Sequence, residues 1–399
     1  MKNIRRVLAV SLTIIMCLCF AACGNDSNTS DESTDTNNDV VSENKTDIAN
    51  KYVGPEMSNE LFDFTVKIDG TVYTVPAKLS DFLNSGWKYS YDNPEEKDVF
   101  GENIESDSFT NKNGSLRFIV SNFSGNTKKF KDCKISKLDY SFSDWNNCTI
   151  ELSKGLILEK DKTAPQDVIN KWGEPTETYT SKYGTTLEYA KEENVKYSIY
   201  FNETGKLSNF QAENQVIDVS DITTNAERPT YLDNYKTPTA LTNDFLSYTF
   251  RLDGALYAFP APVSEFVKNG WEITEQAESV ASHQGISGGI KIRKNGCELT
   301  CSIRNYSDVQ VNAQDTMITS FNWSSTYGNL DLELSGGIKF GITEADFKKC
   351  VDVNDFERHV YENTGTINYD LTEYTHHAYF QFSKDGILKS INFGKKVLE

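Results

Sequence analysis

The residue types that could do chemistry are scattered along this sequence. It has four histidines, His283, His359, His376 and His377, and no motif typical of a serine hydrolase, a zinc protease, a phosphate-binding loop or a calcium loop. His376 and His377 are adjacent in a strand-like stretch, so their side chains should point to opposite faces rather than share a metal. His283 lies in a Ser/Gly-rich loop and is interpreted as solvated. The sequence therefore predicts no catalytic residue, metal site or cofactor, and a protein that is not an enzyme.

Two repeated aspartates, Asp69 and Asp253, are the best candidates for a paired-carboxylate site. Each is followed by glycine and lies between two runs in which apolar and polar residues alternate. An Asp-Gly pair in that position is typical of a tight hairpin turn, because glycine accepts a positive φ. A structural role is therefore favoured for both carboxylates.

Two repeated tryptophans, Trp87 and Trp271, could stack on a sugar ring or belong to the core. Each follows a glycine at the end of a helical stretch, which is the spacing of a Schellman cap. We therefore expect both to be buried. Carbohydrate binding would need a solvent-facing side chain among Trp87, Trp145, Trp271 and Trp323.

The cysteines do not form a repeated framework. Cys297 and Cys301 share a strand face but would be about 13 Å apart along it, too far for a disulfide. Cys133 could bridge Cys148 on a neighbouring strand. An odd number leaves at least one thiol free unless it pairs between chains, so the pairing stays open among Cys133, Cys148, Cys297, Cys301 and Cys350.

A tandem repeat must position all of these residues. Residues 61–88 return without a gap at residues 245–272, with the Asp-Gly and Gly-Trp pairs at the same places. Each copy begins with an alternating run, a turn, a second run and an amphipathic stretch, which predicts a β-hairpin followed by a short helix. The expected fold class is α+β, with two tandem homologous domains, each an antiparallel β-sheet with short helices packed on one face.

A second helix is expected in each copy. In copy one Thr163 is the predicted N-cap, with Pro165 in the first turn and Gln166 at N3. In copy two Thr343 is the predicted N-cap.

The expected organisation has five parts. Residues 1–22 are a signal peptide and residues 23–50 a lipidated cysteine with a disordered acidic stalk, too polar to bury a core. Residues 51–212 form copy one and residues 243–399 copy two. The linker, residues 213–242, is expected to pack partly against a domain through Tyr231 and Tyr235.

The leader predicts export and a lipid anchor. Lys2, Arg5 and Arg6 precede an apolar run at residues 7–20, which is too short to span a bilayer and typical of a signal peptide. The next residues, FAAC, resemble the lipobox of bacterial lipoproteins. The resemblance implies a diacylglycerol on Cys23 and a location on the outer face of the cell membrane. Ordinary cleavage after Ala22 is the alternative.

A second resemblance covers the end of each copy. Residues 151–210, with ELSKGLILEKDKTAPQDVINKWGEP and a later IYFNETGKLSNF, resemble the helix-then-hairpin unit of SmpA/OmlA-like lipoproteins and β-lactamase-inhibitor-like proteins. Residues 333–393 are similar but lack the Gly-x-Pro after the helix. The wider repeat resembles uncharacterised lipoproteins of Firmicutes. The resemblance implies a small antiparallel sheet with helices on one face, in a group whose characterised members bind other proteins.

Charge and composition narrow the function. The net charge of −18 argues against nucleic acid and against a basic membrane-binding face. Tyrosine and tryptophan are plentiful, and they often anchor interfaces. The leading hypothesis is a tethered, non-catalytic module that binds a protein or peptide at the cell envelope. A carbohydrate or cell-wall ligand is the alternative, and an envelope hydrolase would need a cleft with converging carboxylates. Function should be sought where the copies differ.

Lipidation of Cys23 makes a direct prediction. Two acyl chains hold a protein stably on a membrane, so the Cys23→Ser variant should be shed into the medium. An inhibitor of lipoprotein processing should do the same to the unmodified protein. Immunoblots of the membrane and culture fractions measure the outcome. A Cys23→Ser protein that still partitions with membranes would contradict the anchor.

Overall fold

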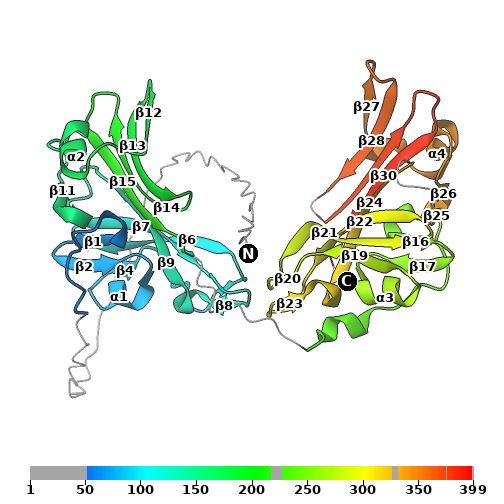
Figure 1. The fold of residues 1–399 in the computed structure, drawn as a ribbon, viewed down its shortest axis with the longest axis horizontal. Coiled ribbons are helices and arrows are strands. Elements are labelled where there is room, and N and C mark those ends of the chain that lie inside the picture. Colours follow the sequence, from blue (N-terminus) through cyan, green and yellow to red (C-terminus); the bar gives the residue numbers. More distant parts are fainter. Residues whose placement is uncertain (1–51, 217–226, 326–330, 374, 398–399) are drawn as a thin grey trace, which may run out of the picture. The chain divides into compact units, whose positions relative to one another are not determined.

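The computed structural model describes residues 52–216, 227–325, 331–373 and 375–397. The predicted signal peptide, Cys23 and acidic stalk lie outside the described residues, as does the middle of the predicted linker. The described chain is mostly antiparallel β-sheet in two sheet-rich halves, which correspond to copy one and copy two (Figure 1). No helix among the described residues is long and apolar enough to cross a membrane.

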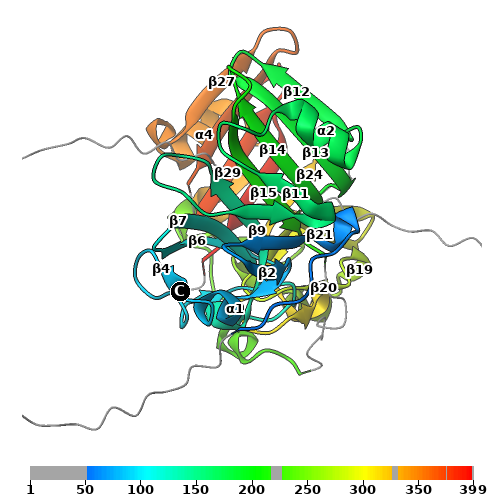
Figure 2. The same ribbon diagram turned by 90° about the vertical axis from the view of Figure 1, so that its left-hand side faces the viewer.

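Copy one contains two main antiparallel sheets, whereas the sequence predicts one. The short sheet has the order β11-β10-β1-β2, and the long sheet has the order β12-β13-β14-β15-β9-β7-β6-β4, with β3 paired to β9. Helix α1 lies beside the β1–β2 hairpin, and α2 lies beside β11 (Figure 2). The elements are β1 (Thr65–Ile68), β2 (Thr71–Thr74), β3 (Ala77–Lys78), α1 (Leu79–Leu83), β4 (Lys88–Tyr89), β5 (Asp98–Val99), β6 (Ile104–Asn111), β7 (Gly114–Ser121), β8 (Lys128–Lys129), β9 (Lys134–Ser141), β10 (Ile150–Leu152), β11 (Leu156–Leu158), α2 (Pro165–Trp172), β12 (Glu177–Ser181), β13 (Gly184–Glu192), β14 (Val195–Asn202) and β15 (Leu207–Asn214).

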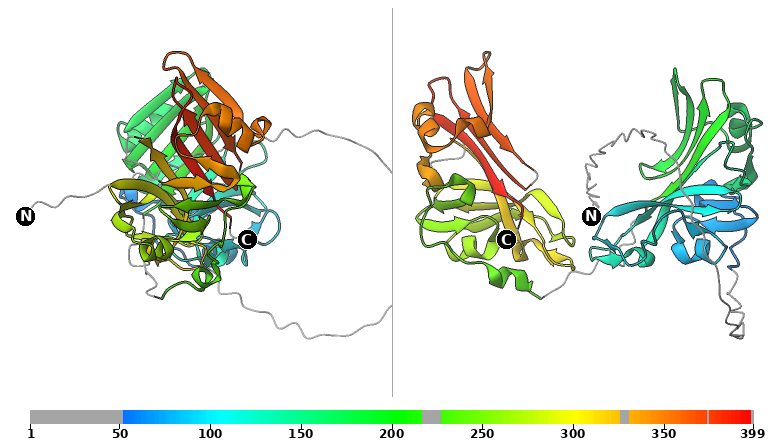
Figure 3. Two further views of the ribbon diagram at one scale, coloured as in Figure 1. Left: turned by 90° about the vertical axis from the view of Figure 1, so that its right-hand side faces the viewer. Right: turned by 180° about the vertical axis from the view of Figure 1, so that it is seen from behind.

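Copy two repeats this topology strand for strand. Its short sheet has the order β17-β16-β25-β26, and its long sheet has the order β19-β21-β22-β24-β30-β29-β28-β27, with β18 paired to β24. The yellow-green α3 and the orange α4 can be followed in Figure 3. The elements are β16 (Thr249–Leu252), β17 (Ala255–Ala258), β18 (Ala261–Pro262), α3 (Val263–Lys268), β19 (Glu272–Gln276), β20 (Ser279–Val280), β21 (Gly285–Lys294), β22 (Cys297–Arg304), β23 (Val311–Asn312), β24 (Met317–Ser324), β25 (Leu332–Leu334), β26 (Ile338–Lys339), α4 (Glu344–Cys350), β27 (Glu357–Tyr361), β28 (Thr366–Thr372), β29 (His376–Phe382) and β30 (Leu388–Lys395).

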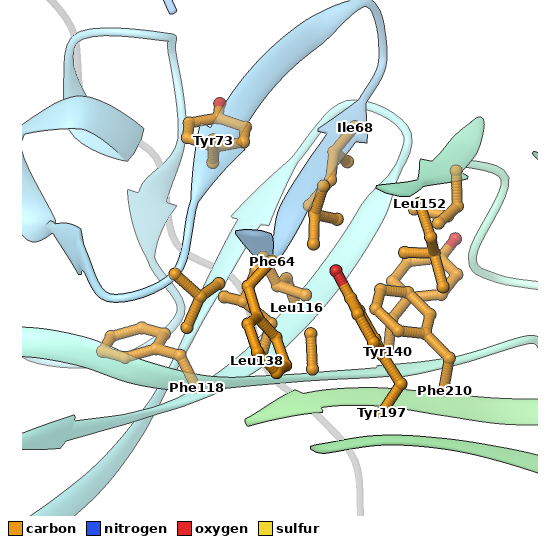
Figure 4. Packing of buried hydrophobic residues seen from close by; sticks show 14 of the residues in the cluster. Phe64, Ile68, Tyr73, Leu116, Phe118, Leu138, Tyr140, Leu152, Tyr197 and Phe210 are labelled. Carbon is orange, nitrogen blue, oxygen red and sulfur yellow. The ribbon is translucent and has the colours of Figure 1, made fainter. Parts of the chain in front are cut away.

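The core of each copy lies between its two sheets and is rich in aromatic rings. In copy one, Phe64 and Tyr73 of the first hairpin face residues of β7, β9, β14 and β15 (Figure 4). Phe64 stacks on Tyr197 with the ring centroids 4.8 Å apart. The alternation that predicts the first hairpin therefore also supplies one wall of the core.

The predicted Asp-Gly turns are confirmed, and the aspartates do more than turn the chain. Asp69 has φ 49° and Gly70 has φ 83°, the left-handed values that a two-residue hairpin turn requires. The Asp69 carboxylate accepts hydrogen bonds from Nδ2 of Asn113 at 2.9 Å, Nδ2 of Asn111 at 3.2 Å and the backbone N–H of Thr149 at 3.0 Å. It therefore ties the first hairpin turn to the second one and to the start of β10.

The predicted helix caps are also confirmed. The N–H of Trp87 donates to the carbonyl of Phe82 at 3.2 Å, and the N–H of Gly86 donates to Leu83 at 3.1 Å. This is the bond pattern of a Schellman cap. Copy two repeats it around Gly270, and Trp87 and Trp271 are both buried.

The second helix begins one residue later than predicted in copy one. Ala164 is the N-cap of α2, and its N–H donates to the Asp167 carboxylate at 2.8 Å. The prediction of Thr163 as N-cap with Gln166 at N3 is wrong, because the N3 side chain that accepts from the N-cap N–H is that of Asp167. The Thr163 hydroxyl instead accepts from the Glu159 N–H. In copy two the N-cap is Thr343, as predicted.

No disulfide joins Cys133 to Cys148. They lie beyond opposite ends of β9, whose eight residues span roughly 26 Å, so this bridge, one of the pairings that the sequence leaves open, does not form. All five cysteines of the described chain are free thiols.

The described end of the linker packs on copy two, as its tyrosines suggest. The Tyr231 hydroxyl donates to the Asp315 carbonyl, and the Tyr235 hydroxyl accepts from the Ala258 N–H, both at 3.1 Å. At the other end, β15 extends copy one to Asn214, beyond the predicted boundary at residue 212.

The three hydrogen bonds to the Asp69 carboxylate, which we call the Asp69 clamp, predict how much stability is lost when this side chain is removed. Asp69→Ala should lower the free energy of unfolding by roughly 2 to 3 kcal/mol, because three donors lose a charged acceptor. Asp69→Asn should cost less, since asparagine tolerates positive φ and keeps one acceptor oxygen. Urea unfolding measures both. The exposed Asp92→Ala is the control, with a change of about 0.5 kcal/mol or less, and an Asp69→Ala protein equal to this control would contradict the clamp.

Candidate functional site

The two faces of the long sheet in copy two differ in character. Along β29, Ala378, Phe380 and Phe382 are buried in the core. His377 and Tyr379 project from the opposite face, because side chains alternate along a strand. We call this second face the open face, and its polar side chains continue on β28, β30, β24 and β22.

The open face of copy two is hollowed across these five strands and the neighbouring β21. The cavity has a volume of about 570 Å³, within the usual range for ligand sites. We call it the copy-two hollow. Its floor and rim carry hydroxyl, amide and charged groups, among them Arg304, Ser320, Asp370, His377, Asn392 and Lys396.

Charges of opposite sign come from different strands of the copy-two hollow. Arg304 ends β22, with its guanidinium over the Tyr306 ring at 5.6 Å from the centroid. The Tyr306 hydroxyl donates to the Lys396 carbonyl at 2.5 Å, which links the two cationic residues. Asp370 lies on β28, and Glu373 follows it. Four strand spacings separate β22 from β28, roughly 19 Å along the sheet.

The charged groups are held in place by their neighbours. Nη2 of Arg304 donates to the carbonyl of His283 at 2.8 Å. The Thr372 hydroxyl donates to Oδ1 of Asp370 at 2.7 Å. Within the part of the chain that the structure describes, Asp370 forms no ion pair. Groups fixed in this way need little reordering when they bind a charged ligand.

His377 forms the middle of the floor. Its Nε2 lies 2.8 Å from Oδ1 of Asn392, which can only accept, so the ring donates there. Burial lowers the pKa of His377 below its ordinary value of 6.5; the hydrogen bond with Asn392 opposes this effect, and the charge of Lys396 adds to it. The imidazole is therefore neutral at pH 7.

Gly394 makes room for this ring. A Cβ at position 394 would lie 2.2 Å from Cβ of Ser320 and 2.9 Å from Cε1 of His377. Contacts that short do not occur between real side chains, so any other residue would displace the floor. Glycine is required at position 394 because the side chains of Ser320 and His377 lie so close to its backbone, and not because the chain turns there.

The same positions in copy one are filled by ion pairs. The strand registers align Lys137 and Glu213 with Ser320 and Gly394, since both pairs are opposite each other in their sheets. Nζ of Lys137 lies 3.1 Å from Glu213, with the side chains 19 % and 10 % exposed. Copy two replaces these two long side chains with a hydroxymethyl group and a hydrogen atom.

A second ion pair covers the neighbouring floor of copy one. Lys196 of copy one corresponds to His377 of copy two, and Glu188 corresponds to Asp370. The Lys196 ammonium and the Glu188 carboxylate lie 3.0 Å apart. Burial lowers the pKa of Lys196, but the hydrogen bond and the charge of Glu188 outweigh it, and the net pKa is raised. Both groups of copy one are thus neutralised internally, whereas Asp370 is not.

The residues singled out in the sequence lie elsewhere. Trp87, Trp271 and Trp323 are buried, while Trp145 is 87 % exposed in the loop between β9 and β10 of copy one. Asp69 and Asp253 hold hairpin turns. Of the histidines, His376 contacts the Tyr248 ring, and His377 alone enters the hollow. His283 is not simply solvated, since its Nε2 lies 2.9 Å from Asp308.

Sequence reasoning did not find the copy-two hollow. Its residues come from six strands whose order in the sheet is not their order in the chain. The available signal was the loss of Lys137 and Glu213 at Ser320 and Gly394, which needs the strand registers to be seen. Among the described residues, no group of three His, Cys, Asp or Glu could hold a metal ion.

Comparison with known proteins adds little. No family model matches this chain, and no curated protein matches it. One similar solved structure is a 6-phosphogluconolactonase candidate from Bacteroides fragilis, at 8 % sequence identity over 76 % of this chain and 85 % of that chain. Its TM-score of 0.13 is too low to support any argument about fold or activity.

The environment of His377 predicts a pH effect. The unfolded chain takes up a proton near pH 6.5, while the folded chain does so only at lower pH, so the folded state loses stability as the pH falls below about 6.5. The NMR titration midpoint of His377 should therefore lie below 6.5. Stability of the His377→Gln variant should fall less between pH 7 and pH 5 than that of the unmodified protein. A midpoint at or above 6.5 would contradict the assignment.

Proposed function

We propose that this chain is an extracytoplasmic lipoprotein, tethered by a diacylglycerol on Cys23, that binds a protein or peptide partner at the cell envelope without catalysis. The copy-two hollow is its binding site. The observation that carries the proposal is the difference between the copies: one open face is closed by internal ion pairs, and the other keeps both charge signs available. Function lies where the copies differ.

The chemistry of the copy-two hollow suits a peptide. A peptide backbone offers alternating donors and acceptors, and the hollow offers the amides of Gln284 and Asn392 with the hydroxyls of Ser302 and Thr372. Fixed cations and carboxylates add specificity for charged groups. Tyr379 and the imidazole of His377 are the two aromatic side chains in the lining, so the site recognises polar groups rather than a large apolar surface.

The family and fold class belong to the same proposal. We place the chain with the lipoproteins that resemble SmpA/OmlA-like and β-lactamase-inhibitor-like domains, with an α+β fold and short helices on one face of each sheet. The packing of the helices supports this. Trp172 of α2 contacts the rings of Tyr189 and Tyr197, and Phe347 of α4 contacts Phe380 on the core face of the long sheet.

A carbohydrate ligand is the second candidate, and one observation favours it. Trp145 is 87 % exposed, and an exposed indole can stack on a sugar ring. It lies in copy one, outside the lining of the copy-two hollow, so the two candidates use different residues and can be tested separately.

Covering the hollow should abolish peptide binding. The chain from residue 24 onward is immobilised, and peptides retained from a random mixture are measured by mass spectrometry. Thr372→Trp adds an indole at the exposed rim, and we expect at least tenfold less retention. Thr300→Trp is the matched control, because Thr300 is exposed on β22 outside the lining.

The outcomes separate the candidates. Retention equal in Thr372→Trp and Thr300→Trp would contradict the hollow as the site. No retained peptide, together with glycan-array binding that Trp145→Ala abolishes, would replace the peptide proposal with the carbohydrate one.

A further inference from the structure

We infer that the copy-two hollow takes a short free peptide in an extended conformation, with its terminal carboxylate at Arg304 and Lys396 and its terminal ammonium at Asp370 and Glu373. This deepens the proposed function and rests on it. The ligand is defined by chemistry: opposite charges at two ends of a polar chain, with no charge required between them.

The carboxylate end is indicated by Arg304. A guanidinium is a planar fork of donors that matches a carboxylate, and this one is fixed by the His283 carbonyl and the Tyr306 ring. Lys396 follows β30 and is tied to the same tyrosine through its carbonyl. Copy one has no counterpart to this cation, because the registers place Ser121 where copy two has Arg304.

The ammonium end is indicated by Asp370. Its counterpart in copy one, Glu188, binds the ammonium of Lys196 at 3.0 Å. Copy two keeps the carboxylate but replaces the lysine with His377, which is not cationic at pH 7. An ammonium group supplied by a ligand would restore the interaction that copy one makes internally. Glu373 directly follows β28, the strand that carries Asp370, and adds a second carboxylate at this side of the hollow.

The distance between the two ends sets the length. Arg304 and Asp370 are on strands separated by four spacings, roughly 19 Å across the sheet. They also lie on opposite sides of the row that joins Ser302 to Thr372, so their separation exceeds this value. An extended chain rises about 3.3 to 3.6 Å per residue, so a peptide needs at least about five or six residues to reach both sides. In a single amino acid the two charges are too close together to reach both sides.

The neutral middle of the hollow fits the body of a peptide. His377 and Asn392 are bonded to each other, and Ser302 accepts the Thr319 hydroxyl through its carbonyl. These groups can bond a peptide backbone without demanding a charge. A polyanion such as a nucleotide would meet Asp370 and Glu373, and a polycation would meet Arg304.

Blocking each end of the peptide tests the inference. Four random pentapeptide mixtures are offered to the immobilised chain: free at both ends, N-acetylated, C-amidated, and blocked at both ends. We expect the free mixture to be retained at least tenfold more than either singly blocked mixture. Each lost charge leaves a protein charge unpaired.

Two substitutions should each remove one preference. Arg304→Gln should bind free and C-amidated peptides alike but still reject N-acetylated ones. Asp370→Asn should bind free and N-acetylated peptides alike but still reject C-amidated ones. The controls are Arg293→Gln and Asp385→Asn, two exposed positions outside the lining, which should keep both preferences. A variant that merely unfolded would lose all binding instead of one preference.

Failure of this inference differs from failure of the proposed function. If blocked and free peptides are retained equally and Thr372→Trp still prevents retention, the hollow binds peptides but does not read their ends, and the inference is wrong. If none of the four mixtures is retained, the proposed peptide-binding function fails and this inference fails with it.

Discussion

Side chains alternate between the two faces of a β-strand, and each long sheet of this protein buries only one face against its short sheet. The core face must be apolar in both copies for the sheets to pack. Tyr140 and Phe210 of copy one accordingly correspond to Trp323 and Ile391 of copy two, all buried. The open face carries no such requirement. Residues on the open face could therefore change after duplication without loss of the fold. The substitutions that alter charge and side-chain size between the copies lie on this face.

The open faces of the two copies differ in how their charged side chains are compensated. Copy one holds its charges partly buried and must pair them, because an unpaired buried charge costs several kcal/mol. Lys137 with Glu213 and Lys196 with Glu188 satisfy that requirement internally. Copy two removes the long side chains and leaves Asp370 and Arg304 at a hollow that solvent reaches. Water can satisfy these charges until a ligand of complementary charge replaces it.

The scaffold beneath the hollow is common to both copies. A bulge at Thr319 shifts the register between β22 and β24 under the floor, and Ser136 is the corresponding extra residue in copy one. The Asp-Gly turns and Gly-Trp caps recur as well. Bulges and clamped turns fix where open-face side chains point. The hollow therefore arises from substitutions on a shared frame together with one backbone change. The register of β21 against β22 shifts between Ile286 and Ile290, beside the lining residue Ser287, whereas β6 of copy one pairs with β7 without a shift.

The sequence by itself determined the repeat, the first hairpin, the Schellman caps of α1 and α3 and the Thr343 N-cap, because these depend on residues close together in the chain. It placed the N-cap of α2 one residue early, because the Thr163 hydroxyl accepts from the Glu159 N–H and not from the first turn of the helix. Only the tertiary structure decided that each copy has two sheets, that Cys133 lies far from Cys148, and that Ser320, Asp370, His377 and Gly394 surround one hollow. Those facts depend on strand order and register, which are set by packing between strands distant in sequence. The local sequence pattern of a strand does not specify which distant strand will pair with it.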